Sequence, residues 1–82
     1  MSTDILVVDD EPDIRELIAG VLEDDGHGVR VAATAERAID EVRGRTPSLV
    51  VLDVWLQGSD MDGLAVLKYL KTIDPMLPVI VI

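Results

Sequence analysis

Two sets of aspartates in this sequence directly follow two short apolar runs. Asp9 and Asp10 come after residues 5–8, and Asp53 comes after residues 49–52. Unbroken aliphatic runs of this kind are typical of strands that are buried on both faces of a parallel sheet. Because ligands of such sheets bind at the carboxyl ends of the strands, these positions suit binding or chemistry. We therefore expect the three carboxylates to lie together if the two strands are neighbours.

Three carboxylates in one place would favour a divalent cation and phosphoryl chemistry. Crowded negative charges raise one another's pKa values, and a hard cation such as Mg²⁺ relieves the repulsion through oxygen ligands. A carboxylate can also attack phosphorus to form an acyl phosphate, while the ion offsets the charge on the phosphoryl oxygens. The same residues fit a simpler interpretation, in which Asp9 and Asp10 form a helix-capping turn and Asp53 is a hydrogen-bonded turn residue.

The rest of the chain predicts an α/β fold with a doubly wound parallel sheet. Strand-like runs alternate with segments whose apolar residues recur at helical spacing, which implies right-handed crossovers between parallel strands. Pro12 suits the first position of the first helix, and Gly26 and Gly28 are expected to end it. Thr34 suits the N-cap of the second helix. The predicted elements are a strand at 5–8, a helix from 12, a strand at 29–32, a helix at 35–43, a strand at 49–52, a helix from 62 to 73 and a strand at 79–82.

Two of these elements carry further expectations. Apolar residues along the first helix recur on one side, which predicts the face that packs on the sheet. This stripe consists of Ile14, Leu17, Ile18, Val21 and Leu22. Residue types alternate in the strand at 29–32, which predicts a strand that is more exposed than the others.

Composition excludes several classes of protein. The chain has 82 residues, a formal net charge of −9 and no cysteine. The acidity argues against nucleic-acid or anionic-membrane binding through this segment, and the lack of cysteine excludes disulfides and thiol chemistry. No apolar run approaches the ~20 residues that a membrane-spanning helix needs, and the N-terminus lacks the basic start of a signal peptide. A cytoplasmic protein of one domain is expected.

The sequence ends in an apolar run at residues 79–82. At the edge of a sheet, this run would present unpaired backbone groups and β-branched side chains to other molecules. We therefore expect residues 1–82 to be a portion of a larger domain. We also expect a homo-oligomer, formed through this edge or by exchange of elements with a second copy.

Three motifs together resemble the receiver domain of two-component response regulators, the CheY-like family. They are the run at 5–11 with its paired aspartates, the run at 49–53 that ends at Asp53, and the sequence Met61-Asp62-Gly63. The loop at 53–59 is longer than the usual one and is similar to that of the NtrX subgroup of nitrogen-regulation regulators. The resemblance implies a flavodoxin-like sheet of order 2-1-3-4-5, of which this chain would hold the part up to the fourth strand.

The resemblance also implies a role for each candidate residue. Asp53 would accept a phosphoryl group from a sensor histidine kinase. Mg²⁺ would be bound directly by Asp10 and Asp53, mainly through water by Asp9, and by the backbone carbonyl of Trp55. The hydroxyl and lysine residues that contact the phosphoryl oxygens in this family would lie beyond Ile82. In the NtrX type, an ATPase domain and a DNA-binding domain follow the receiver, so the expected output is control of transcription.

Two other functions remain open. An aspartyl phosphohydrolase typically has two aspartates separated by one residue after its first strand, whereas Asp9 and Asp10 are adjacent and Glu11-Pro12 supplies no matching acid. A degenerate association module would use the sheet only for pairing and would need no ion. We therefore expect a signalling domain and not an enzyme, and Mg²⁺ binding separates it from a pairing module.

Overall fold

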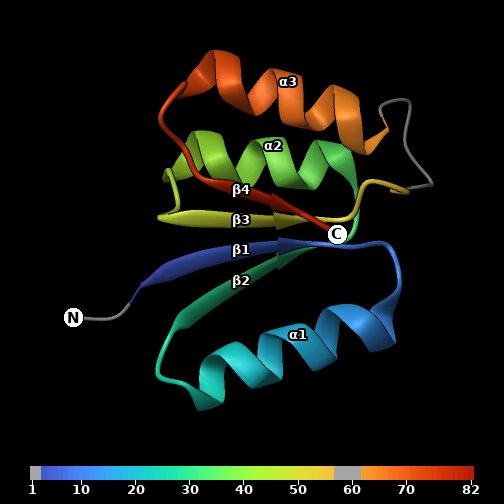
Figure 1. Ribbon diagram of the computed structural model, residues 1–82, viewed down its shortest axis with the longest axis vertical. Helices are drawn as coiled ribbons and strands as arrows, with labels where there is room; N and C mark the ends of the chain where they lie inside the picture. Colours follow the sequence, from blue (N-terminus) through green and yellow to red (C-terminus); the bar gives the residue numbers. More distant parts are fainter. Residues whose placement is uncertain (1–2, 57–61) are drawn as a thin grey trace.

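The computed structural model describes residues 3–56 and 62–82. Within these residues, strands and helices alternate in the order that the sequence predicts (Figure 1). The elements are β1 (Asp4–Val8), α1 (Pro12–Asp24), β2 (Gly28–Ala32), α2 (Ala35–Gly44), β3 (Leu49–Leu52), α3 (Gly63–Ile73) and β4 (Val79–Val81). In this part of the chain, no helix has the length and hydrophobicity that spanning a bilayer requires.

The sheet is parallel throughout, and β1 lies between β2 and β3. The strand order is β2-β1-β3-β4, which confirms the predicted doubly wound arrangement for these strands. Val8 of β1 is paired with Leu52 of β3, and the N–H of Asp53 donates to the Val8 carbonyl at 2.9 Å. The chain therefore leaves β1 and β3 side by side at the same edge of the sheet.

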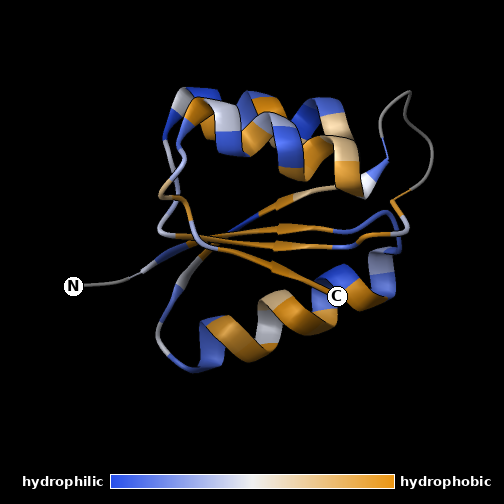
Figure 2. Ribbon diagram, turned by 45° about the horizontal axis from the view of Figure 1, so that its top comes forward, coloured by the Kyte–Doolittle hydropathy of each residue, from blue (hydrophilic) through white to orange (hydrophobic). Residues whose placement is uncertain are grey.

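Helices cover both faces of the sheet, with α1 on one side and α2 and α3 on the other (Figure 1). Figure 2 shows strands that are hydrophobic along most of their length between polar loops. Successive strand residues point to opposite faces. The side of α2 and α3 receives Leu6, Val8, Val50 and Leu52, and the side of α1 receives Ile5, Val7 and Val51. The core is therefore aliphatic on both faces, and it holds the ends of β1 and β3 in place.

The first helix buries less of its apolar stripe than the sequence predicts. Ile18 and Leu22 pack against the strands. Ile14, Leu17 and Val21 are 42%, 63% and 60% exposed, so the prediction was wrong for these three. The reason is that a single helix lies on this face among the described residues, and only the side of it that touches β1 and β2 is covered.

Local chemistry sets the ends of the helices. Pro12 begins α1, and the Thr34 hydroxyl accepts a backbone N–H of α2 at 3.2 Å, both as predicted. Gly26 follows α1 with a φ of 92°, a left-handed conformation that glycine adopts without steric cost. Gly28 does not end the helix, because its N–H donates to the Thr3 carbonyl at 2.7 Å and makes it the first residue of β2.

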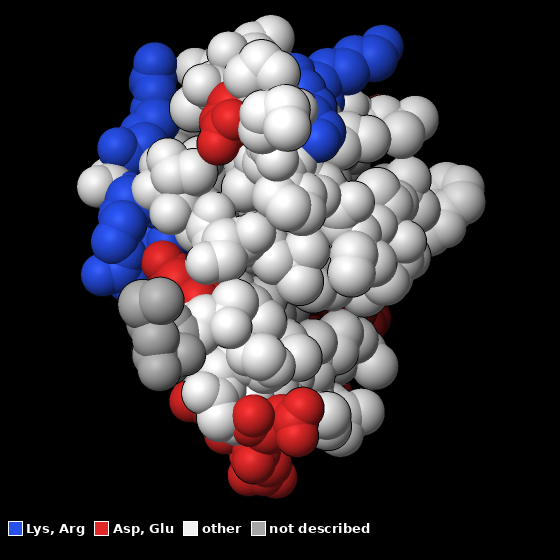
Figure 3. Space-filling view, turned by 60° about the vertical axis from the view of Figure 1, so that its left-hand side comes forward, with Lys and Arg blue, Asp and Glu red and all other residues white. Residues whose placement is uncertain are grey.

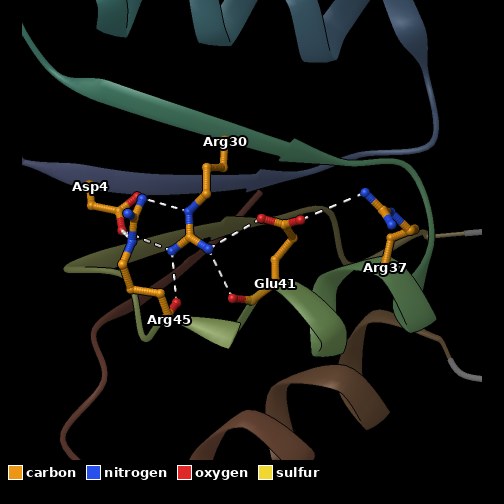
Figure 4. A network of polar contacts seen from close by, with 5 residues as sticks. All are labelled: Asp4, Arg30, Arg37, Glu41 and Arg45. Atoms are coloured by element: carbon orange, nitrogen blue, oxygen red, sulfur yellow. Dashed lines mark hydrogen bonds and ion pairs between the residues drawn. The ribbon is translucent and has the colours of Figure 1, made fainter. Parts of the chain in front are cut away.

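As the alternating pattern predicts, β2 is more exposed than β1 and β3, and Arg30 links it to the neighbouring elements. Its guanidinium donates to the two carboxylate oxygens of Asp4, at 3.0 and 2.8 Å, and to the Glu41 carboxylate at 3.2 Å (Figure 4). It also donates to the backbone carbonyls of Glu41 and Arg45, at 2.9 and 2.8 Å. This network joins the start of β1 to the last turns of α2, so Arg30 is half-buried.

Candidate functional site

The three candidate carboxylates meet at the carboxyl ends of β1 and β3. One carboxylate oxygen from each of Asp9, Asp10 and Asp53 lies within 4.8 Å of the other two. The pairing of β1 with β3 causes this, because Asp9 and Asp10 follow one strand and Asp53 follows the other. The predicted convergence is confirmed by the geometry, while the role of each residue stays a prediction.

Asp9 is buried, with 3% of its surface exposed, and it is held at three points. Its N–H donates to the Ala32 carbonyl at 3.1 Å, and its carbonyl accepts from Nη1 of Arg15 at 2.9 Å. Its Oδ1 accepts the N–H of Glu11 at 2.9 Å, which is the turn geometry of the simpler interpretation. That turn occupies one carboxylate oxygen and leaves Oδ2 for a water molecule or an ion.

Asp53 is half-buried, and its surroundings disfavour its charged form. Burial raises the pKa of its carboxyl, and the negative charges of Asp9 and Asp10 raise this pKa further. The N–H of Trp55 donates to Oδ1 at 2.9 Å and lowers the pKa in part. The net pKa shift is upward, as expected for a carboxylate that shares a small space with two others.

The described residues offer these carboxylates no ion pair. The ion pairs of the arginines involve Asp4 and Glu41, and none involves Asp9, Asp10 or Asp53. Three carboxylates without a cationic partner lose mutual repulsion when a divalent cation binds among them. Because all the donors are oxygens, the residues fit a hard cation such as Mg²⁺.

The segment after Asp53 lines a mostly apolar hollow. A cavity of about 300 Å³ is lined by Val54, Trp55, Leu56, Asp62 and Leu64. The Trp55 side chain is 78% exposed, and the expected role of its backbone carbonyl in ion binding stays a prediction. Residues 57–59 of the loop that resembles the NtrX subgroup, and Met61 of the third motif, lie outside the described residues.

Sequence reasoning missed two residues that support this site. Gly63, the first residue of α3, lies against the backbone of Asp53 and leaves no room there for a side chain. Arg15 holds the carbonyl of Asp9 from within α1. The sequence Asp62-Gly63 signals the first of these, but no pattern marks Arg15, because its partner is fixed by the way the helix meets the strand.

Comparison with known proteins gives a family and close relatives. The family model described as response regulator receiver domain matches residues 5–82. The nitrogen assimilation regulatory protein NtrX of Azorhizobium caulinodans is 51% identical over 82 residues, which is 100% of this chain and 18% of the relative. The transcriptional regulatory protein ZraR of Escherichia coli (strain K12) is 36% identical over 78 residues, which is 95% of this chain and 17% of the relative.

Solved structures agree with the fold. The crystal structure of the receiver domain of NtrX from Brucella abortus is 55% identical with a TM-score of 0.93, covering 95% of this chain and 65% of that one. A crystal structure of NtrX from the same organism is 54% identical with a TM-score of 0.95, covering 99% of this chain and 19% of that one. The chain thus spans 18% and 17% of the length of the two curated relatives.

Proposed function

Because this chain belongs to the response regulator receiver family, we propose that it accepts a phosphoryl group on Asp53 from a sensor histidine kinase. One observation carries the proposal. Carboxylate oxygens of Asp9, Asp10 and Asp53 lie within 4.8 Å of one another, at the edge of the sheet where ligands of such folds bind. This is the arrangement that a phosphoacceptor and its metal ligands require.

The Asp53 carboxylate is the nucleophile of the proposed step. Its Oδ1 accepts the N–H of Trp55 at 2.9 Å, so one of the two carboxylate oxygens is already engaged. A P–O bond to Asp53 forms as the P–N bond of the kinase's phosphohistidine breaks, and the electron pair of the broken bond stays on the imidazole nitrogen. The product is an acyl phosphate on Asp53 and an unphosphorylated histidine on the kinase.

In this proposal, the burial of each residue determines whether it binds Mg²⁺ directly or through water. Asp10 and Asp53 are half-buried and would bind the ion directly, together with the backbone carbonyl of Trp55. Asp9 is buried and has one oxygen engaged by Glu11, so it would act mainly through water. A bound Mg²⁺ supplies positive charge that offsets the charge of the phosphoryl oxygens.

Phosphorylation by acetyl phosphate in the presence of Mg²⁺ tests the proposal. We expect one phosphoryl group on the chain by intact mass, located on Asp53 by peptide mapping, and none on Asp53→Asn. Asp40→Asn removes an exposed carboxylate of α2 and should be labelled like the parent chain. Labelling that persists in Asp53→Asn, or a folded, Mg²⁺-binding parent chain that takes no label, would contradict the role of Asp53.

Titration with Mg²⁺ separates a signalling domain from a pairing module. Trp55 is the single tryptophan, and its N–H contacts Asp53, so its fluorescence reports on the site. We expect a saturable change in the parent chain and the loss of most of it in Asp10→Asn. A titration that Asp10→Asn leaves unchanged would remove Asp10 from the ligand set.

We infer that the chain is a phosphoacceptor and not an aspartyl phosphohydrolase. Asp9 and Asp10 are adjacent, and the next residue, Glu11, is exposed at the start of α1 with its N–H bonded to Asp9. The acid two positions after Asp9 is thus an exposed glutamate and not the aspartate that such hydrolases carry there. Steady turnover of p-nitrophenyl phosphate by the purified chain would contradict this inference.

We further propose that the chain associates with a second copy through β4, by strand pairing or by exchange of elements. This strand lies at the end of the strand order β2-β1-β3-β4. Ile80, Val81 and Ile82 are 52%, 42% and 48% exposed, and an edge with apolar side chains is open to pairing. We expect the mass measured by light scattering to rise above that of a monomer with concentration. A monomer over the whole range would exclude the pairing.

For the whole protein, we propose a cytoplasmic regulator whose output is transcription, as the family and the names of its relatives NtrX and ZraR indicate. DNA would be bound outside this segment, because a net charge of −9 opposes contact with phosphates. Fluorescence anisotropy with duplex DNA at low salt should show no binding by this chain. Salt-dependent binding would contradict that division of roles.

A further inference from the structure

Arg15 joins the first helix to the aspartate loop through a backbone contact. It lies in the first turns of α1, and its Nη1 donates to the carbonyl of Asp9 at 2.9 Å. The side chain is half-buried and forms no ion pair among the described residues. Long helical side chains lean toward the helix N-terminus, which brings this guanidinium back over the loop.

The carbonyl of Asp9 is the first backbone acceptor beyond the sheet. The N–H of Asp9 still belongs to the strand ladder, because it donates to Ala32 at 3.1 Å, and the Val8 carbonyl accepts from Asp53 at 2.9 Å. The Asp9 carbonyl has left the ladder, and Arg15 supplies its donor. Because a peptide unit is planar, a fixed Asp9 carbonyl also fixes the backbone nitrogen of Asp10.

We propose that Arg15 is a positioning residue for the divalent cation of this site. By holding the peptide that joins Asp9 and Asp10, it sets the direction from which Asp10 presents its carboxylate toward Asp53. This inference rests on the proposed function, since it concerns the same ion site. Arg15 does not touch the ion or the phosphoryl group in this role, and it acts through the backbone of Asp9.

The charge of Arg15 would weaken the binding of a divalent cation and not strengthen it. A positive charge near a helix N-terminus is unfavourable, and it also repels a second cation bound close by. Arg15 is the single basic residue of α1, whose other charged residues are acidic. On the face shown in Figure 3, acidic side chains gather at the lower end, where α1 lies, and basic ones gather toward α2 and α3. The planar guanidinium also provides a directional hydrogen bond, and this bond is the property of Arg15 that can position the loop.

Charge repulsion and loop positioning predict opposite changes in ion affinity when Arg15 is replaced. The inference can therefore be tested with Mn²⁺ as the probe. Arg15→Met removes the charge and the donors but keeps an unbranched side chain of similar reach. If only charge mattered, the variant would bind Mn²⁺ more tightly, and the gain would fade at high salt. If Arg15 positions the loop, we expect binding to weaken about tenfold at low and high salt, as for other groups that orient metal ligands.

The experiment measures free Mn²⁺ by electron paramagnetic resonance across a protein titration. Arg15→Lys keeps the charge and a single donor nitrogen in place of the guanidinium, so we expect an affinity between those of the parent chain and Arg15→Met. Arg37→Met removes an exposed arginine of α2, with 65% of its side chain exposed, and should leave the affinity unchanged. Urea unfolding in EDTA identifies any variant that does not fold. If Arg15→Met does not fold, the Mn²⁺ affinity of Arg15→Lys tests the positioning role in its place.

The outcomes separate this inference from the function on which it rests. Equal or tighter Mn²⁺ binding by folded Arg15→Met, with the parent chain binding normally, overturns the positioning role and leaves the phosphoacceptor site standing. A variant that is only less stable, with an unchanged affinity, overturns it equally and makes Arg15 a structural residue. A parent chain that binds no Mn²⁺ overturns the ion site and the inference with it.

Discussion

A β-carbon on Gly63 would stand 2.5 Å from the carbonyl oxygen of Asp53. It would also lie 2.6 Å from Cα of Val54 and 2.7 Å from the Val54 carbonyl oxygen. These atoms are all backbone atoms, which cannot move aside as a side chain can. Gly63 is buried as the first residue of α3, so the absence of a side chain lets this helix begin directly against the loop that carries Asp53.

Gly63→Ala should therefore destabilise the fold and disturb the site together. We expect the free energy of unfolding to fall by about 1–3 kcal/mol, the usual cost of an overpacked position, as measured by urea denaturation. The Mg²⁺ response of Trp55 fluorescence should weaken, because the displaced loop carries both Asp53 and Trp55.

Gly20→Ala is the matched control for this substitution. A β-carbon at Gly20, in the interior of α1, would have no heavy atom within 4 Å apart from the local backbone of its own helix. We expect this variant to gain about 0.5–1 kcal/mol, because alanine favours the helix over glycine. A Gly63→Ala chain as stable as the parent would show that the backbone after Asp53 yields at little cost.

Asp4→Asn should lower stability in a pH-dependent way. Burial by itself would raise the pKa of Asp4, but the hydrogen bonds and charges of Arg30 and then Arg45 outweigh it and lower this pKa. A carboxyl with a lowered folded pKa stabilises the fold above its unfolded pKa, and this stability is lost as the pH falls through the folded pKa. We expect Asp4→Asn to cost about 1–2 kcal/mol near pH 7 by urea denaturation, and less as the pH falls below about 4.

Asp40→Asn serves as the comparison for Asp4, because Asp40 is an exposed residue of α2 outside the Arg30 network. The free energy of unfolding of this variant should stay within about 0.5 kcal/mol of that of the parent chain. A cost for Asp4→Asn that stays constant from neutral to acid pH would mean that the packing of this side chain matters more than its charge.

The parts of the fold that the sequence predicts are those set by local pattern. Residues of β1 and β3 are buried on both faces, so their aliphatic runs are unbroken and easy to recognise. A carboxylate directly after such a run must lie at the carboxyl edge of the sheet. This reasoning brings Asp9, Asp10 and Asp53 together if the two strands are neighbours, and the pairing of β1 with β3 meets that condition.

The remaining features depend on partners that are distant in the sequence. The alternating pattern of β2 gives no sign of the contacts of Arg30, because its partner Asp4 lies 26 positions earlier in the sequence. Leu17 belongs to an apolar stripe yet is 63% exposed, because the stripe gives the direction of a helix face and not the extent of what covers it. The contact of Arg15 with a backbone carbonyl leaves no signal in residue types.

Asp53→Asn should stabilise the metal-free protein at neutral pH. Burial and the charges of Asp9 and Asp10 raise the pKa of Asp53 above its unfolded value. Its contribution to stability is therefore fully present below the unfolded pKa, about 4, and is lost as the pH rises through the folded pKa. Asparagine imitates the protonated carboxyl, so in EDTA the variant should exceed the parent chain near pH 7 and match it at acid pH.

Mg²⁺ should reverse this order, because an ion that binds only the folded state stabilises it by mass action. We expect thermal denaturation of the parent chain to shift upward with Mg²⁺ concentration, and that of Asp53→Asn to shift much less. Parallel pH profiles for the two chains in EDTA would show that the charge of Asp53 is not under strain in the metal-free site.

Ile80→Lys should reduce association through β4 without unfolding the chain. Ile80 is 52% exposed in the middle of this edge strand, and a lysine on an edge strand opposes pairing with a second sheet because its charge would be desolvated. Since the residue is already half in solvent, the free energy of unfolding of the monomer should change by less than about 1 kcal/mol. We expect light scattering to report a monomer at concentrations where the parent chain forms an oligomer.

Met76→Lys is the matched control, because it adds the same charge at an 85% exposed residue before β4. It should leave the association of the parent chain in place. An oligomer that Ile80→Lys leaves intact would exclude β4 as the contact.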